Sequence, residues 1–117
     1  MNDRDMEILK LIIRYADELE AGMKVHNVTY NTFLSDPFIK NSISMSVFQI
    51  TELTGKLSEE CKKKHNKLPW ISIKGMRNRF AHGYEGMDID FIWEAATEDV
   101  PKLRAYCDKI LKDEKYE

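Results

Sequence analysis

The sequence predicts an all-α protein, an up-and-down bundle of four main helices. Apolar residues recur every three or four positions along most of the chain, which is the spacing of one face of an α-helix. No segment shows the sustained alternation of apolar and polar residues that a half-buried strand needs. Capping residues and prolines then divide the chain into separate helices.

The first helix is expected from Asp3 to about Val25, with Asp3 as its N-cap and Asn27 as its stop. A connection follows, with a short helical turn at Tyr30–Leu34. One apolar stripe along the first helix predicts that a single face is buried. The stripe consists of Leu9, Ile12, Ile13, Ala16, Leu19 and Met23.

The second helix is expected to begin at Asp36, a cap, and Pro37, whose fixed φ suits the first helical position. It is predicted to be the longest helix and to run to about Lys64. Glu52 stands among apolar neighbours, so a half-buried, hydrogen-bonded structural acid is favoured over a catalytic one. The apolar stripe is Ile43, Val47, Ile50, Thr54, Leu57 and Cys61.

Pro69 opens the third helix, and Asp88 can cap the fourth. Thr97, followed by two acids, is predicted to break the fourth helix by acting as a new cap. That helix should end near Lys112. A length of 117 residues predicts one domain, 1–117. The stripe of the third helix is Ile73, Met76 and Phe80.

Composition bounds the class of protein. Hydrophobic residues make up 43% and charged residues 32% of the chain, as in a water-soluble globular domain. No apolar run is long enough to cross a bilayer, and the charged N-terminus predicts no signal peptide, so a cytoplasmic location is expected. Cys61 and Cys107 lack CxxC spacing and are expected in the core, in a reducing compartment. Scattered histidines predict no zinc site.

Basic residues gather in one part of a chain whose net charge is −2. Residues 61–84 contain no acid, and such a local basic face suits a phosphate-bearing substrate. The alternative is that the three consecutive lysines merely favour the last turn of a helix, where cations suit the helix dipole. The basic residues are Lys62, Lys63, Lys64, Lys67, Lys74, Arg77 and Arg79.

The segment 77–84 concentrates the chemistry. Arg77 can grip phosphate oxygens, His82 can transfer a proton near neutral pH, and Tyr84 adds a hydroxyl. On a straight helix Arg77 and His82 would lie about 140° apart. Gly83 can end the helix, so a site at the helix end, completed by a second subunit, would resolve this mismatch. The alternative is three ordinary surface residues.

Six short stretches follow one another along the chain: Gln49–Glu52, Lys56–Glu60, Leu68–Trp70, Gly75–Asn78, His82–Tyr84 and Ile92–Glu94. Together they resemble the HepT-like toxins, a branch of the HEPN superfamily of all-helical ribonucleases. The resemblance covers about residues 36–111. Its most specific part is a motif of arginine, four residues, histidine, any residue and tyrosine. In this chain the motif is Arg77, His82 and Tyr84, with Asn78 as the polar residue expected after the arginine. One departure is visible, since Thr51 stands where the family has glycine, at a helix-packing position.

The resemblance implies a HEPN-like homodimer whose two motifs form one composite site. It implies RNA cleavage without a metal or cofactor, through attack of the ribose 2′-hydroxyl, which leaves a 2′,3′-cyclic phosphate and spares DNA. His82 would act as general acid or base and Arg77 would stabilise the phosphate. Asn78 would orient groups, and Lys74 and Arg79 would contact the RNA backbone.

The resemblance also implies a partner, a nucleotidyltransferase antitoxin of the MntA-like kind. That partner would attach AMP to Tyr84, placing a bulky anion two residues from His82. Two other functions stay open from the residues. One is a non-catalytic helical module that binds nucleotides or scaffolds a nucleotidyltransferase, and the other is a dimerising bundle without a ligand.

Overall fold

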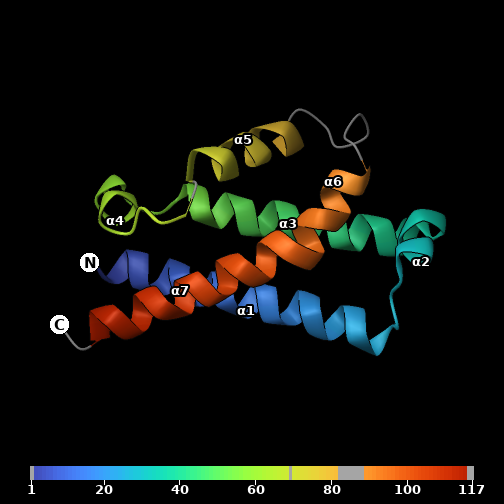
Figure 1. Ribbon diagram of the computed structural model, residues 1–117, viewed down its shortest axis with the longest axis horizontal. Coiled ribbons are helices and arrows are strands. Elements are labelled where there is room, and N and C mark those ends of the chain that lie inside the picture. Colours follow the sequence, from blue (N-terminus) through green and yellow to red (C-terminus); the bar gives the residue numbers. More distant parts are fainter. Residues whose placement is uncertain (1, 69, 82–88, 116–117) are drawn as a thin grey trace.

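The computed structural model describes residues 2–68, 70–81 and 89–115, without the side chains of residues 70–72, 74, 80, 81 and 115 (Figure 1). All regular elements in these ranges are helical, which confirms the predicted all-α class. Pro69 and Asp88, two predicted helix starts, lie outside the described residues. The elements are α1 (Asp3–Val25), α2 (Tyr30–Ser35), α3 (Pro37–Gly55), α4 (Glu59–Lys64), α5 (Trp70–Ala81), α6 (Ile89–Glu94), a π-helical segment (Ala95–Asp99) and α7 (Val100–Lys115).

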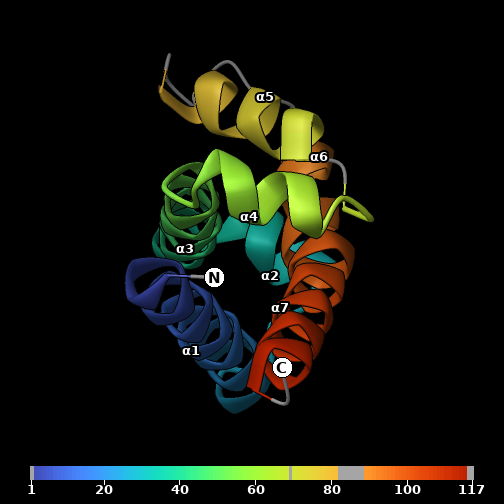
Figure 2. The same cartoon turned by 90° about the vertical axis from the view of Figure 1, so that its left-hand side faces the viewer.

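Three long helices form the body of the molecule. α1 packs against both α3 and α7, and the molecule measures 47 × 30 × 20 Å. α5 lies on α3, on the side away from α1 (Figure 2). α3 is therefore the main support of α5, and it fixes where the side chains of α5 are held.

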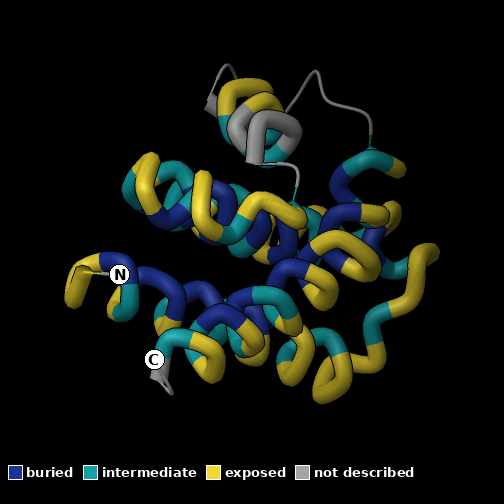
Figure 3. The backbone as a smooth tube through the Cα atoms, turned by 60° about the vertical axis from the view of Figure 1, so that its left-hand side comes forward, coloured by how far each residue is buried: buried dark blue, intermediate teal, exposed yellow. Residues whose placement is uncertain are grey.

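The core follows the apolar stripes read from the sequence. Buried segments of α1, α3 and α7 face one another, while their outer faces are exposed (Figure 3). Both cysteines are buried and free, as predicted, and burial raises the pKa of Cys61 to about 11 and that of Cys107 to about 12. The core residues are Ile8, Leu9, Ile12, Ala16, Leu19, Phe33, Ile43, Val47, Ile50, Leu57, Cys61, Ile92, Ala95, Ala96, Val100, Leu103, Cys107 and Ile110.

The helix ends test the capping predictions. Asp36 accepts hydrogen bonds from the backbone N–H groups of the two residues after Pro37, which confirms the predicted start of α3. The predicted cap of α1 is wrong by one residue, because the side chain of Asn2 accepts from the N–H of Asp5 at 2.7 Å. Asn27 has a φ of 50°, the left-handed conformation expected just after a helix end.

The predicted continuous helix from Pro37 to Lys64 is wrong. α3 ends at Gly55, and α4 begins anew with Ser58 as its N-cap. Asp5, only 2% exposed, holds this break by accepting from Ser58 N at 2.9 Å and Ser58 Oγ at 2.6 Å. The carboxylate that stabilises the break belongs to α1, so the local apolar stripe could not reveal it.

The irregularity predicted near Thr97 exists, but Thr97 is not a cap. The chain stays helical through a π-helical segment, and the Thr97 hydroxyl donates back to the Trp93 carbonyl at 2.8 Å. The N–H of Val100 donates to the carbonyl of Ala95, five residues earlier. This wide turn makes room for Pro101, which cannot donate and whose ring would crowd the preceding turn of an α-helix.

Candidate active site

α5 presents the predicted arginine at the edge of its buried face. Ile73 and Met76 are partly buried against the core, as their spacing predicted. Arg77, next to Met76, is half-buried with 35% of its side chain exposed. A guanidinium in this position keeps part of its surface in solvent while its stem is fixed by packing.

A carboxylate from α3 meets this arginine. Arg77 Nε donates to Glu52 Oε1 at 3.1 Å, and the Glu52 side chain is 33% exposed. Gly55, one helical turn further along α3, lies beneath the same side chain. A Cβ built on Gly55 would lie 3.3 Å from Arg77 Nη1 and 3.4 Å from its Cδ. The Arg77 side chain therefore packs against the backbone at Gly55, and its Nε is hydrogen-bonded to the Glu52 carboxylate.

The other predicted site residues are placed less completely. Asn78 and Arg79 are exposed on α5, and the Arg79 guanidinium lies 4.3 Å from the centre of the Phe91 ring, a cation–π contact that ties α5 to α6. Lys74 belongs to α5, but its side chain is not described. His82 and Tyr84 lie outside the described residues, so their predicted roles stay predictions.

The sequence did not identify Glu52 as the partner of Arg77. The two residues are 25 positions apart on different helices, and local periodicity carries no information on such pairs. A signal was present, however. Residues 41–51 of α3 contain no charged side chain, and Glu52 interrupts this neutral run. A lone acid at the end of such a run is a candidate partner for a cation on a neighbouring helix.

One of the basic residues is paired within the fold. Lys64 pairs with Glu114 of α7 at 2.8 Å, and His65 Nε2 lies 3.0 Å from the same carboxylate. Lys64 lies in the last turn of α4 together with Lys62 and Lys63, which favours the helix-end interpretation of these three lysines. Lys64 and then His65 lower the pKa of Glu114 to about 2. This cluster stabilises the contact between α4 and α7.

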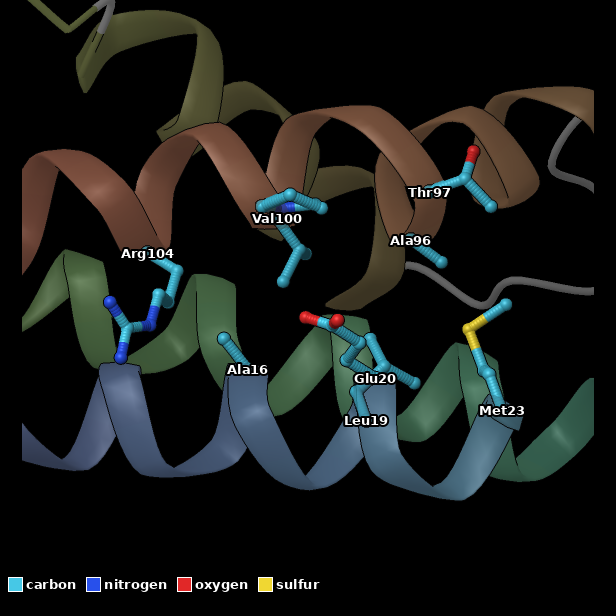
Figure 4. A pocket seen from close by; sticks show the side chains of 9 residues that line it. Ala16, Leu19, Glu20, Met23, Ala96, Thr97, Val100 and Arg104 are labelled. Carbon is cyan, nitrogen blue, oxygen red and sulfur yellow. The ribbon is translucent and has the colours of Figure 1, made fainter. Parts of the chain in front are cut away.

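Two pockets flank the π-helical segment. One, of about 370 Å³, lies between α1 and the start of α7, and Glu20 and Arg104 are among its lining residues (Figure 4). Its arginine is bound to Asp17 through Nε and Nη2, at 3.0 and 3.3 Å. The other, of about 390 Å³, lies under α5 and includes Thr51, whose hydroxyl donates to the Phe48 carbonyl at 2.8 Å. Among the described residues that line these two pockets, Arg77 is absent.

Over residues 2–68, 70–81 and 89–115, no helix is long and apolar enough to cross a membrane. Within the same residues, no group of three or more His, Cys, Asp or Glu side chains is placed to hold a metal ion.

A model of the family described as "Ribonuclease HepT-like" matches residues 7–110, which include both Arg77 and Glu52. The class of protein is therefore an all-helical endoribonuclease. The chain belongs to the Ribonuclease HepT-like family, as the resemblance predicted.

Individual relatives agree with the family. A protein named "Putative RNase" from Caldanaerobacter subterraneus is 33% identical over 92 residues, covering 79% of this chain and 82% of its own. A "Putative RNase" from Methanocaldococcus jannaschii is 29% identical over 97% of this chain and 93% of its own. A "Probable ribonuclease HepT" from Thermococcus cleftensis is 26% identical over 73% and 77%. No solved structure matches the chain significantly.

Proposed function

We propose that this protein is a metal-independent endoribonuclease toxin that cuts RNA through its own 2′-hydroxyl. The observation that carries the proposal is Arg77, half-buried on α5 and held by Glu52 in a chain of the Ribonuclease HepT-like family. A fixed guanidinium whose terminal nitrogens donate to none of the described residues suits a phosphodiester, because charge builds up on the phosphate oxygens in the transition state.

The proposed reaction needs one proton to leave and one to arrive. The 2′-hydroxyl gives up its proton, its oxygen bonds to the adjacent phosphorus, and the bond from phosphorus to the 5′-oxygen breaks. The departing oxygen takes a proton, and the other fragment ends in a 2′,3′-cyclic phosphate. His82 is the proposed general acid or base, a role that contributes about 10²–10⁴-fold to such reactions. Arg77 holds the phosphate, Asn78 orients it, and Lys74 and Arg79 contact the backbone.

The proposal includes a second copy of the chain. Two subunits that bring their 77–84 segments together would place each arginine near a histidine, which one straight helix does not achieve. The proposal also includes a nucleotidyltransferase antitoxin that transfers AMP to Tyr84. The added phosphate would occupy the guanidinium and the nucleoside would block RNA.

Cleavage of RNA in excess EDTA tests the proposal. The wild type, Arg77→Ala and His82→Ala are incubated with a labelled RNA and with its 2′-deoxy counterpart, and products are resolved with their end groups. The expected result is cleavage of RNA alone by the wild type, with cyclic phosphate ends, and loss of cleavage in both variants. Arg104→Ala is the matched control, because this arginine also pairs with a carboxylate but lies in α7, and it should cut like the wild type.

Other results would reject the proposal. Cleavage retained by both Arg77→Ala and His82→Ala would assign the activity to another site or a contaminant. A wild type that does not cut RNA but binds a nucleotidyltransferase tightly would favour the non-catalytic module. The mass of Tyr84-containing peptides after co-expression with the partner, compared with Tyr84→Phe, tests the AMP transfer separately.

A further inference from the structure

Glu52 is the carboxylate that meets the proposed catalytic arginine, and the reaction as proposed above gives it no part. We infer that Glu52 is a positioning residue: it fixes the guanidinium of Arg77 through Nε so that the terminal nitrogens face the scissile phosphate. This inference rests on the proposed ribonuclease function. Its basis is the 3.1 Å hydrogen bond from Arg77 Nε to Glu52 Oε1, between α5 and α3.

Glu52 binds the Nε edge of the guanidinium, and this choice of edge decides which donors can meet a substrate. A guanidinium has five N–H donors, one on Nε and two on each terminal nitrogen. To the described residues, Arg77 donates from Nε. The four terminal N–H groups donate to none of the described residues, and paired donors of this kind suit an incoming phosphate. Glu52 can therefore orient Arg77 without competing for the nitrogens that substrate needs.

α3 limits the position of the guanidinium in a second way. Glu52 and Gly55 are three residues apart, so they lie on the same face of α3. The side chain of Arg77 crosses Gly55 closely enough that a Cβ there would lie 3.3 Å from Nη1. The carboxylate accepts from Nε, and the backbone at Gly55 lies close to Cδ and Nη1 of the same side chain. A long side chain that would otherwise sample many rotamers is thus restricted before RNA binds.

A stabilising role for the fold does not account for this arrangement. Both partners are about one third exposed, and ion pairs in that setting contribute little to stability. The core contacts between α3 and α5 are made by other residues, among them Ile73 and Met76. Loss of Glu52 should therefore change the reaction much more than the fold.

A double-mutant cycle tests the inference. Single-turnover cleavage of one RNA at saturating enzyme is measured for the wild type, Glu52→Ala, Arg77→Ala and the double variant. Thermal unfolding and binding of the uncleavable 2′-deoxy strand are measured for the same four proteins. We expect Glu52→Ala to slow cleavage about 10- to 100-fold, with a small change in unfolding temperature. In the Arg77→Ala background the same change should have no further effect.

Two variants refine the cycle. Glu52→Gln keeps an oxygen that can accept from Nε and should lose less activity than Glu52→Ala. Lys56→Ala is the control on α3, because Lys56 is exposed beyond the end of the helix, and its rate should equal that of the wild type.

The outcomes separate the two claims. Slowing by Glu52→Ala that is equally large with and without Arg77 would overturn the positioning role. So would an unchanged rate in Glu52→Ala, or a loss of rate explained by unfolding. A wild type that leaves RNA intact would overturn the proposed function itself, and with it the inference that depends on it.

Discussion

Two arginines of this protein pair with a carboxylate on another helix, and the two pairs differ in which nitrogens they use. Arg104 of α7 engages Asp17 of α1 through both Nε and Nη2, so the fork of the guanidinium is filled. Arg77 of α5 engages Glu52 through Nε, and its terminal nitrogens donate to none of the described residues. The side chains are similarly exposed, at 38% and 35%.

The difference distinguishes an arginine that links two helices from an arginine that can still bind a ligand. An arginine whose Nε and Nη2 both donate to one carboxylate links two helices and has few donors left for a ligand. The hydrogen bonds to Asp17 also raise the pKa of Arg104. An arginine held at one edge is oriented but still able to donate. The exposed fraction of the side chain does not distinguish the two residues. The number of guanidinium nitrogens that donate to a carboxylate does, since Arg104 uses two and Arg77 uses one. Arg77 is thus the better candidate for recognising phosphate.

Replacing each arginine by lysine should give the largest difference between the two residues. Lysine keeps the charge but lacks the planar fork. Arg77→Lys should slow RNA cleavage by about 10²–10³-fold, because the fixed donors that stabilise the transition state are lost. Arg104→Lys should cut at the wild-type rate and change the free energy of unfolding by at most about 1 kcal/mol. Single-turnover cleavage and urea unfolding measure both effects, and equal losses of rate in the two variants would contradict the distinction.

A methyl group under the guanidinium should have a smaller effect. Gly55→Ala places a Cβ 3.3 Å from Arg77 Nη1, so the guanidinium must shift by a few tenths of an ångström. We expect cleavage to slow about tenfold, since catalysis is sensitive to such displacements. Gly22→Ala in α1 is the matched control, because nothing lies within 4 Å of its Cβ.

Alanine favours the helix at both positions, so unfolding is not the expected cause of the rate loss, and thermal unfolding of Gly55→Ala checks this. Gly22→Ala should stabilise the protein by about 0.5–1 kcal/mol and leave the rate unchanged. A Gly55→Ala variant that cuts as fast as the wild type would show that the close support of Arg77 has no functional weight.

A third carboxylate extends the comparison to a pairing with no proposed function. Lys64 and His65 lower the pKa of Glu114 from 4.5 to about 2. Between those values the unfolded state binds more protons than the folded one, so the stabilisation is present above about pH 4.5 and lost as pH falls toward 2. Glu114→Gln should therefore unfold at a lower temperature than the wild type near pH 6, and the difference should vanish toward pH 2.

Melting curves across that pH range check this expectation. Glu98→Gln, at an exposed position of the π-helical segment, is the control and should track the wild type. A Glu114→Gln difference that grows as the solution is acidified would contradict the assignment. Cleavage near neutral pH should be unaffected by either change.

Local signals in the sequence were enough for much of this fold. The stripe of α1 and the Asp36–Pro37 start of α3 depend on residues within a few positions of one another, and the structure has them as expected. The short helix α2 and the buried cysteines also follow from local pattern. The motif around Arg77 was recognisable for the same reason, since it is contiguous in the chain.

The errors and omissions arose from long-range partners. The break before α4 depends on Asp5, which is 53 positions from Ser58. Glu52 and Arg77 come together because α5 folds onto α3, and no periodicity within either helix encodes that contact. A cap, a turn or a stripe can be read locally, but a hydrogen bond between helices requires the fold.

The π-helical segment between α6 and α7 has a consequence for chain length. A single π turn holds one residue more than an α-helical turn. Ala95–Asp99 therefore acts as a one-residue insertion within the continuous helix formed by α6 and α7. Deleting that surplus residue should leave Trp93 against Phe33 at one end and Arg104 against Asp17 at the other. The shortened helix would need Pro101 replaced as well, because a tighter turn has no place for its ring.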